Sequence, residues 1–563
     1  MIRERKISGR EIIGWLLICL STGMLGRSIL LCFSQDIWYD ELFTVSMAEH
    51  SYGELVRFTA ADVHPPLYYI IVKFFAELCK LLMPGTGTVI PAKLVSTLPF
   101  LLLLLYSVTW IRKRWGIFTG GLFLFCVTAM PQLPAYTVEV RMYGWALLFV
   151  TAAFWHAQGC LTENRRYLHG AAFVLYSLAA AYTQYFAAVA VGMVYLYLLI
   201  MFLCRDRSRL REWFCYVAIS VVCYVPWLFA LAGQISAVRE NYWILPLSWR
   251  SLGGCVKFLM KPAFTNDVLN TVLAVVLFAA YVVVVGYPVL SAFMSKNKIK
   301  EKKLYRNGRQ ERGGFSQGGT DSGEHAAEVN QITYMIAGVG VLAGLVAFGF
   351  AASILIRPIF VYRYMIPALG CFWFSFALGM DGILCKPKYQ EQTEDVLCKP
   401  EDRAEMKGKL CKLKTALALS LIAFIIAVGL RDFRAFRGEE EYKIVSMRET
   451  ETALSLIAPE DTVIYNFDQV QAVTAYYLPE STERFLWGGS AESLIQEMIG
   501  PCGTLENVDE ISELAGKEGN LWFIGSFNSR DAIVEEWREA GLSVEEVGSF
   551  LLERYWFNLY KIS

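Results

Sequence analysis

The chain has 563 residues, of which 55% are hydrophobic and 18% are charged, and this composition excludes an ordinary soluble protein. Its 52 basic and 52 acidic residues cancel, so no nucleic-acid partner is expected. The 14 cysteines are scattered and form no Cys-x-x-Cys pair. Only Cys385, Cys398 and Cys411 recur at an even spacing in one polar segment, which is a weak signal for a metal site.

The first predicted element is a basic segment followed by an apolar run, MIRERKISGREIIGWLLICLSTGMLGRSILLCF. It has no small-residue cleavage site, so we predict an uncleaved membrane span near 11–33. Further apolar runs are about 20 residues long, which is enough to cross a bilayer as a helix. These runs lie near 66–83, 90–111, 116–135, 142–161, 167–184, 186–204, 213–235, 267–294, 332–356, 364–384 and 414–431.

The charges between the runs decide which of them cross the membrane. If the run 66–83 lies along the outer surface, the basic amino terminus and all later basic loops share the cytoplasmic side, as the positive-inside rule requires. We therefore predict about 11 transmembrane helices in the plasma membrane, with a cytoplasmic amino terminus and an extracytoplasmic carboxyl terminus. The basic loops are 112–114, 163–166, 204–211, 296–303 and 385–388.

The character of the sequence changes near residue 432. The stretches DTVIYNF, NLWFIGS and FNLYKI predict short strands, and DAIVEEWREAG and YKIVSMRETETALSLI have helical spacing. We predict a polytopic α-helical membrane domain over 1–431, with a first outer loop at 34–89 that carries surface helices. A small extracytoplasmic α/β domain is predicted over 432–563.

Ionisable residues near membrane spans are costly and usually functional, and here they gather on the predicted outer face. Non-catalytic roles are also possible for these residues: Glu139 could form a structural ion pair with Arg141, and Arg357 and Arg363 could hold lipid headgroups. The convergence of loops that are far apart in the sequence on one face favours a functional site. The set comprises Asp36, Asp40, Glu41, Asp62, His64, Glu139, Arg141, Tyr182, Gln184, Tyr185, Arg357, Arg363 and Tyr364.

Within the outer loop, the stretch ADVHPPLYY places an acid and a histidine before two prolines. Proline is tolerated at a helix start, so Pro65 and Pro66 predict a surface helix that holds Asp62 and His64 near the outer membrane surface. Asp40 and Asp62 could instead simply cap the helices that follow them, and His64 could be a satisfied structural histidine.

These motifs carry a resemblance. The stretch WYDELFTVSMAEHSYGELVRFTAADVHPPLYYIIVKFF resembles the first extracytoplasmic loop of GT-C glycosyltransferases of the bacterial family 39 type. These are relatives of protein O-mannosyltransferases and of the lipid A aminoarabinose transferase. YTVEVRMYGWALL, AYTQYFA, NYWILP and VYRYMIPALG resemble later motifs of the family, and the resemblance covers about residues 10–385.

The resemblance implies a reaction and roles for residues. A sugar held on a polyprenyl phosphate would be transferred, with inversion, to a lipid, polysaccharide or protein acceptor on the outer side. Asp40 would be the general base or would orient the acceptor, Glu41 belongs to the same motif, and Glu139 would be the second acid. Gln184 departs from the pattern, because many bacterial members have His there. Metal use varies in the superfamily, so the resemblance allows a divalent metal without requiring one, and it implies no other cofactor.

Physical chemistry adds detail to these roles. Adjacent helical residues point about 100° apart, so Asp40 and Glu41 are expected to act separately, with Glu41 facing a backbone group, an arginine or a metal. Arginine offers paired donors to a phosphate. Residues expected to bind the donor's phosphate or sugar are Asp62, His64, Arg141, Tyr143, Gln184, Tyr185, Arg357, Arg363 and Tyr364.

Two other classes of protein have many spans and buried charges. A transporter or flippase of a lipid-linked sugar tends to show internal repeats and charges at the membrane midplane, and the sequence shows neither. A sensory or structural membrane protein would leave the acids of the outer loops unexplained. Glycosyl transfer is therefore the preferred hypothesis, without a named sugar or acceptor.

Overall fold

The computed structural model describes residues 8–163, 165–238, 244–307, 321–384, 400–479, 481–489, 497–499, 505–514, 516–517 and 519–563. The chain divides into two compact units. The first comprises Met1–Gly26, Pro99–Thr137 and Tyr143–Arg434, and the second comprises Arg27–Leu98, Val138–Met142 and Ala435–Ser563.

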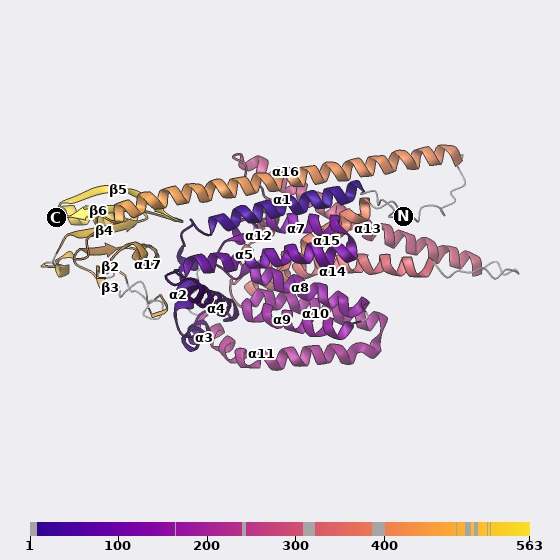
Figure 1. The fold of residues 1–563 in the computed structure, drawn as a ribbon, viewed down its shortest axis with the longest axis horizontal. Coiled ribbons are helices and arrows are strands. Elements are labelled where there is room, and N and C mark those ends of the chain that lie inside the picture. Colours follow the sequence, from indigo (N-terminus) through magenta and orange to yellow (C-terminus); the bar gives the residue numbers. More distant parts are fainter. Residues whose placement is uncertain are drawn as a thin grey trace. The chain divides into compact units, whose positions relative to one another are not determined.

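Long apolar helices build the first unit, and Figure 1 shows α8, α9, α10 and α15 running side by side. Helices α1, α5 and α16 carry residues of both units. The helices with residues in the first unit are α1 (Gly9–Leu31), α5 (Val89–Tyr106), the π-helical turn Ser107–Ile111, α6 (Arg112–Trp115), α7 (Ile117–Ala129), α8 (Tyr143–Thr162), α9 (Arg166–Thr183), α10 (Tyr185–Arg205), α11 (Leu210–Val238), α12 (Arg250–Met260), α13 (Asp267–Asn307), α14 (Asp321–Leu355), α15 (Ile366–Leu384) and α16 (Pro400–Leu454).

Eight helical segments within the described residues are long and apolar enough to cross a membrane. They are Gly9–Leu31, Val89–Trp115, Tyr185–Arg205, Arg207–Ile235, Asp267–Leu290, Gln331–Leu355, Tyr362–Leu384 and Lys412–Leu454. The protein is therefore a multi-pass membrane protein, as its composition predicted. Helices α7, α8 and α9 occupy three further predicted runs but are shorter or less apolar, so the number 11 stays a prediction.

Small residues let the helices of the first unit approach closely. A Cβ on Gly121 of α7 would lie 2.3 Å from the carbonyl oxygen of Gly14 in α1, so neither helix could approach the other as closely with a larger residue there. Such glycine contacts are typical of helix pairs in membranes, where van der Waals packing replaces the hydrophobic effect. Aromatic rings complete the packing, and Phe154 stacks on Tyr334 at 4.2 Å between ring centroids.

Three helices form the segment between α1 and α5 in the second unit: α2 (Tyr39–Glu49), α3 (Tyr52–Ala61) and α4 (Leu67–Leu82). The predicted helix after the two prolines is confirmed as α4, with Pro66 at its N-cap position. The capping interpretations of the two aspartates are wrong. Asp40 lies inside the first turn of α2, whose N-cap is Trp38, and Asp62 ends α3 by donating its backbone N–H to the Phe58 carbonyl.

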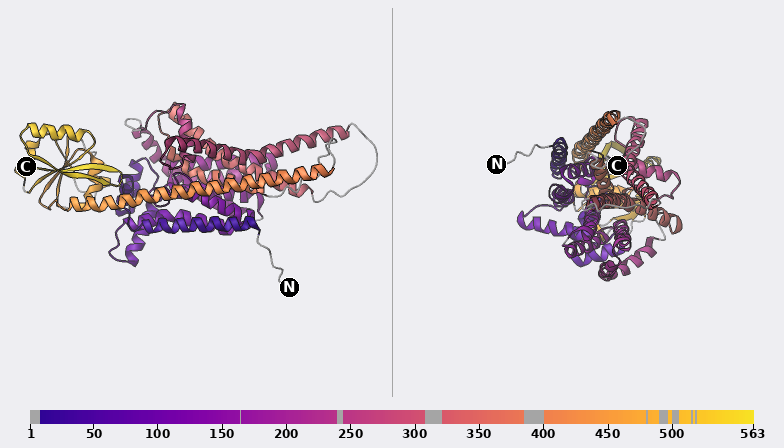
Figure 2. Two further views of the ribbon diagram at one scale, coloured as in Figure 1. Left: turned by 90° about the horizontal axis from the view of Figure 1, so that it is seen from above. Right: turned by 90° about the vertical axis from the view of Figure 1, so that its right-hand side faces the viewer.

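The carboxyl-terminal part of the second unit is a mixed six-stranded sheet with the order β3-β2-β1-β4-β6-β5. Strands β1, β2, β3 and β4 are parallel, and β6 pairs antiparallel with both β4 and β5. Figure 2 shows the fanned strands with the last helix beside them. The elements are β1 (Thr462–Tyr465), α17 (Asp468–Thr474), β2 (Glu483–Trp487), β3 (Glu506–Val508), β4 (Leu521–Ser526), α19 (Ser529–Glu539), β5 (Val544–Leu552) and β6 (Tyr555–Ile562).

One face of this sheet is covered by α19, whose Trp537 is buried against Phe523 and Phe485. The start of β1 is fixed by Asp461, which accepts hydrogen bonds from Asn520 and from the Trp522 ring nitrogen. The predicted α/β fold of the tail is therefore confirmed. Its division from the membrane domain at residue 432 stays a prediction, since α16 continues without a break to Leu454.

Candidate functional site

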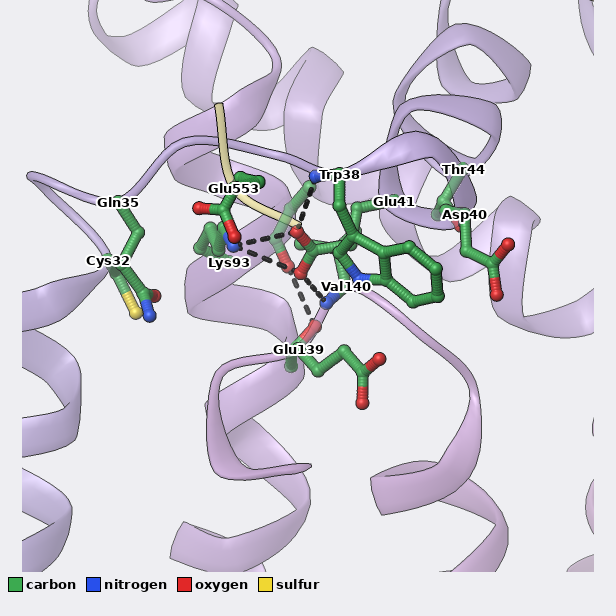
Figure 3. A network of polar contacts seen from close by, with 12 residues as sticks. Cys32, Gln35, Trp38, Asp40, Glu41, Thr44, Lys93, Glu139, Val140 and Glu553 are labelled. Carbon is green, nitrogen blue, oxygen red and sulfur yellow. Dashed lines mark hydrogen bonds and ion pairs between the residues drawn. The ribbon is translucent and has the colours of Figure 1, made fainter. Parts of the chain in front are cut away.

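The candidate site lies in the second unit, around the first turn of α2 (Figure 3). Three other segments contribute to it: the start of α5, the turn 138–142 and the turn between β5 and β6. The site therefore depends on long-range packing, because these segments are far apart in the sequence.

Glu41 is the most enclosed carboxylate of the site, with 2% of the residue exposed. Both of its oxygens lie 3.0 Å from Lys93 Nζ. It also accepts the backbone N–H of Val140 at 2.7 Å and that of Trp38 at 3.3 Å. One carboxylate thus ties together α2, α5 and the turn 138–142 (Figure 3), and its hydrogen-bonding capacity is occupied by the protein itself.

Asp40 has a different environment although it is the preceding residue. Figure 3 shows the two carboxylates pointing in different directions. The Asp40 side chain is 24% exposed, and Arg141 Nη2 lies 3.9 Å from its Oδ2. Arg141, which is 5% exposed, also donates from Nη1 to the Asp40 carbonyl oxygen at 2.9 Å. The arginine therefore positions an accessible carboxylate, while Glu41 holds the backbone beneath it.

Glu139 and Asp36 lie in the same unit. A guanidinium nitrogen of Arg554 is 3.5 Å from Glu139 Oε1, and the guanidinium carbon lies 3.7 Å from the centre of the Trp38 ring. Asp36 accepts a short hydrogen bond from the Tyr477 hydroxyl. Burial raises the pKa of Asp36 to about 6, although this hydrogen bond opposes the shift.

A fourth acid enters from the turn between β5 and β6. Glu553 is buried, and its Oε2 lies 3.8 Å from Lys443 Nζ. Burial raises the pKa of Glu553 to about 8. The nearby Lys93 and Lys443 lower this pKa, while Glu41 and Glu440 raise it further.

Asp62 and His64 form a pair at the junction of α3 and α4, with His64 Nδ1 2.9 Å from Asp62 Oδ2. Burial alone would raise the pKa of Asp62, but the hydrogen bond and charge of His64, aided by Arg141, hold it below its usual value. Tyr69 interacts electrostatically with Arg141, Asp62 and Asp40. Its fully buried hydroxyl has no hydrogen-bond partner in the described part of the chain.

The remaining predicted residues lie in the first unit. The Arg363 guanidinium stands over the Tyr143 ring at 5.9 Å, and Tyr364 stacks on Phe186 at 4.7 Å. The structure therefore brings Arg363 and Tyr143 together, and their part in a substrate site stays a prediction.

Tyr185 and Gln184 begin α10. The Tyr185 hydroxyl donates to Gln234 and accepts from the Trp227 ring nitrogen at 3.0 Å. Gln184 is the N-cap and is buried, and its side-chain oxygen has no hydrogen-bond partner within the residues described. Arg357 follows the end of α14 and donates its backbone N–H to the Ala352 carbonyl at 3.3 Å.

Sequence reasoning missed Lys93, Glu553 and Arg554. Lys93 had a usable signal, because a lysine in the first turn of an apolar span needs a partner. Glu553 and Arg554 had none, since a charged pair between two short strands usually faces solvent.

No group of three or more His, Cys, Asp or Glu side chains that could hold a metal ion occurs in the described ranges. Of the evenly spaced cysteines, Cys385 and Cys398 lie outside those ranges. The weak metal signal of that segment therefore stays untested.

Comparison with known proteins adds information at the level of the fold. No family profile matches the sequence, and no curated protein matches it either. Among solved structures, ArnT from Cupriavidus metallidurans in the apo state matches with a TM-score of 0.54 at 13% identity, over 98% of both chains. The structure of the same protein bound to undecaprenyl phosphate matches with the same values. The expected likeness is therefore confirmed for the fold, which the chain shares with ArnT over 98% of its length.

Proposed function

We propose that the protein is an integral membrane glycosyltransferase. It moves a sugar from a polyprenyl-phosphate-linked donor to an acceptor on the extracytoplasmic face, with inversion at the sugar carbon. The observation that carries the proposal is Asp40, an accessible carboxylate that Arg141 positions beside the fully engaged Glu41. The shared fold with ArnT, one of whose structures holds undecaprenyl phosphate, supports the choice of donor.

In this proposal Asp40 acts as the general base. It takes the proton of an acceptor hydroxyl while the hydroxyl oxygen bonds to the anomeric carbon. The bond from that carbon to the phosphate oxygen breaks, and the lipid phosphate leaves with the electron pair. Because phosphate is a good leaving group, it needs cations and donors rather than a general acid.

The other acids take different roles. Glu41 is a positioning residue, because its oxygens are already bonded to Lys93 and to the backbone. Glu139, whose side chain is 10% exposed and lies 3.5 Å from Arg554, is the second acid. Asp62 and His64 face the donor phosphate near the start of α4.

Six residues of the first unit are also proposed to bind a substrate group. They bind the sugar or its phosphate, and they are Tyr143, Gln184, Tyr185, Arg357, Arg363 and Tyr364. The transferred group is a hexose or pentose, in the manner of the mannosyltransferases and the aminoarabinose transferase that the first loop resembles. The acceptor is a lipid, a polysaccharide or a protein. No observation favours the transporter or flippase alternative.

The test is transfer of label from a panel of radiolabelled polyprenyl-phosphate sugars by the purified protein, with cell-extract acceptors. Asp40→Asn should lower the rate by about 10²–10⁴-fold, the range for loss of a general base. Asp509→Asn, at an exposed aspartate of the tail, is the matched control and should keep the rate.

Two results would contradict the proposal. Full activity of Asp40→Asn would exclude Asp40 as the base. Label that stays on every donor, with folded wild-type protein, would exclude transfer from this class of donor.

A further inference from the structure

The turn between β5 and β6 has a sequence that is unusual for its backbone conformation. Glu553 and Arg554 alone connect the two strands, and Glu553 has φ 53°. A two-residue hairpin turn with positive φ at its first position favours glycine there. The chain instead has a glutamate whose side chain is buried beside Lys443, so the side chains of this turn serve a purpose other than turn formation.

That purpose is indicated by where the turn lies. Glu553 interacts electrostatically with Lys93 and Glu41, and the Arg554 guanidinium contacts Trp38 and Glu139. The next residue follows the same pattern: burial raises the pKa of the Tyr555 hydroxyl, and the charge of Asp40 raises it further. The carboxyl-terminal sheet thus contributes three consecutive residues to the acid cluster of the first outer loop.

Accessibility distinguishes Arg554 from the other cations of the cluster. The side chains of Lys93, Arg141 and Lys443 are 3%, 5% and 12% exposed, whereas that of Arg554 is 47% exposed. Lys93 and Arg141 are also directed at Glu41 and Asp40. A negatively charged ligand that approaches this cluster therefore meets Arg554 as its accessible cation.

The Arg554 side chain is also held in place for binding. Its guanidinium carbon lies 3.7 Å from the centre of the Trp38 ring, which packs against it, and its contact with Glu139 is long at 3.5 Å. A stacked guanidinium keeps its N–H groups available at the edge of the plane, where they match phosphate oxygens in pairs.

We infer that the β5–β6 turn is part of the substrate site and that Arg554 binds a phosphate there. The inference rests on the proposed function in taking the phosphate to be that of the lipid-linked substrate. The same chemistry would recognise free inorganic phosphate, and the experiment separates these two sources.

The experiment measures equilibrium binding of undecaprenyl phosphate and, separately, of inorganic phosphate to the purified full chain in detergent. Arg554→Gln should weaken binding of the phosphate that Arg554 holds by about tenfold or more, as expected for a lost charge-assisted pair. Arg554→Lys keeps the charge but not the paired donors, so its affinity should lie between that of Arg554→Gln and that of the wild type.

The matched control is Arg57→Gln. Arg57 is 61% exposed, pairs with Glu497 at 2.7 Å and stands over the Phe58 ring at 4.7 Å, so like Arg554 it is an accessible arginine with an acidic partner and an aromatic ring. The Arg57→Gln variant should bind both ligands with the affinity of the wild type. Thermal melts of all variants show whether they are folded.

The possible outcomes distinguish the two sources of phosphate. Weaker binding of undecaprenyl phosphate alone assigns Arg554 to the lipid-linked substrate, and weaker binding of both ligands assigns it to phosphate in general. Unchanged binding by a folded Arg554→Gln, an equal loss in Arg57→Gln, or no binding of either ligand by the wild type would overturn the inference. Binding needs no turnover, so absence of sugar transfer would contradict the proposed function without affecting this result.

Discussion

At the scale of single residues, the site shows how neighbouring carboxylates acquire different roles. Asp40 and Glu41 have the same chemistry, yet one is accessible beside Arg141 and the other is enclosed by Lys93 and the backbone. Their divergence was predictable from helical geometry. The partner of Glu41 was not, because Lys93 is 52 residues away and only the folded chain brings it near.

The Glu41–Lys93 pair should be important for stability because both charges are buried. Removing one charge of a buried pair leaves the other uncompensated, at a cost of about 3–5 kcal/mol. We expect Lys93→Met to lower the melting temperature strongly. The double variant Lys93→Met with Glu41→Gln should be less destabilised, since it removes the unpaired charge and keeps an acceptor for Val140.

A surface pair provides the control for this prediction. Lys517 and Glu483 lie 2.8 Å apart but are 36% and 52% exposed. Such pairs contribute about 0–1 kcal/mol to the free energy of unfolding, so Lys517→Met should barely change the melting temperature. A double variant less stable than Lys93→Met alone would show that the charges do not compensate one another.

At the scale of elements, the sequence predicted those with a strong local signal. The apolar run after the two prolines is α4, and the strands β1, β4 and β6 lie where apolar stretches predicted them. Strand β5 was missed because it is a polar edge strand: VEEVGSFLL is exposed along most of its first half and carries a bulge near Gly548.

The turn that follows β5 should make stability depend on pH. The ordinary pKa of a glutamate, 4.5, is raised to about 8 for Glu553 by burial. Between these values the folded protein retains a proton that the unfolded chain releases, so stability is highest at low pH and falls as the pH rises towards 8. Glu553→Gln cannot ionise, so its melting temperature should decline less between pH 5 and pH 8.

The control for the pH experiment lies on the same strand. Glu545 is exposed on β5, and Glu545→Gln should keep the pH dependence of the wild type. If the melting temperature declines equally in the wild type and in Glu553→Gln, other groups cause the pH dependence.

At the scale of the whole molecule, composition and charge predicted a multi-pass helical protein with an α/β tail, and both features are present. Local sequence could not predict that the segment 34–89 and the tail belong to one compact unit. Contacts such as Arg554 with Glu139, which are 415 residues apart, depend on the complete fold.

The predicted orientation can be tested with reporter fusions. The basic segment 204–211 should be cytoplasmic and the tail extracytoplasmic, because basic loops are retained inside. Alkaline phosphatase fused after Ser563 should be active, and green fluorescent protein fused after Arg209 should fluoresce. Exchange of the two reporters should abolish both signals, and the reverse pattern would contradict the orientation.

The position of Glu553 and Arg554 has a consequence for biosynthesis. Asp40 and Glu41 leave the ribosome early, but the turn that completes their surroundings is made roughly 500 residues later, which at about 5–20 residues per second takes roughly 25–100 s. During this interval the segment that carries Asp40 and Glu41 exists without Glu553 near Lys93 or Arg554 over Trp38. The acid cluster is therefore assembled only when synthesis is nearly finished. A chain truncated before this turn carries Asp40 and Glu41 but lacks the contacts of Glu553 and Arg554.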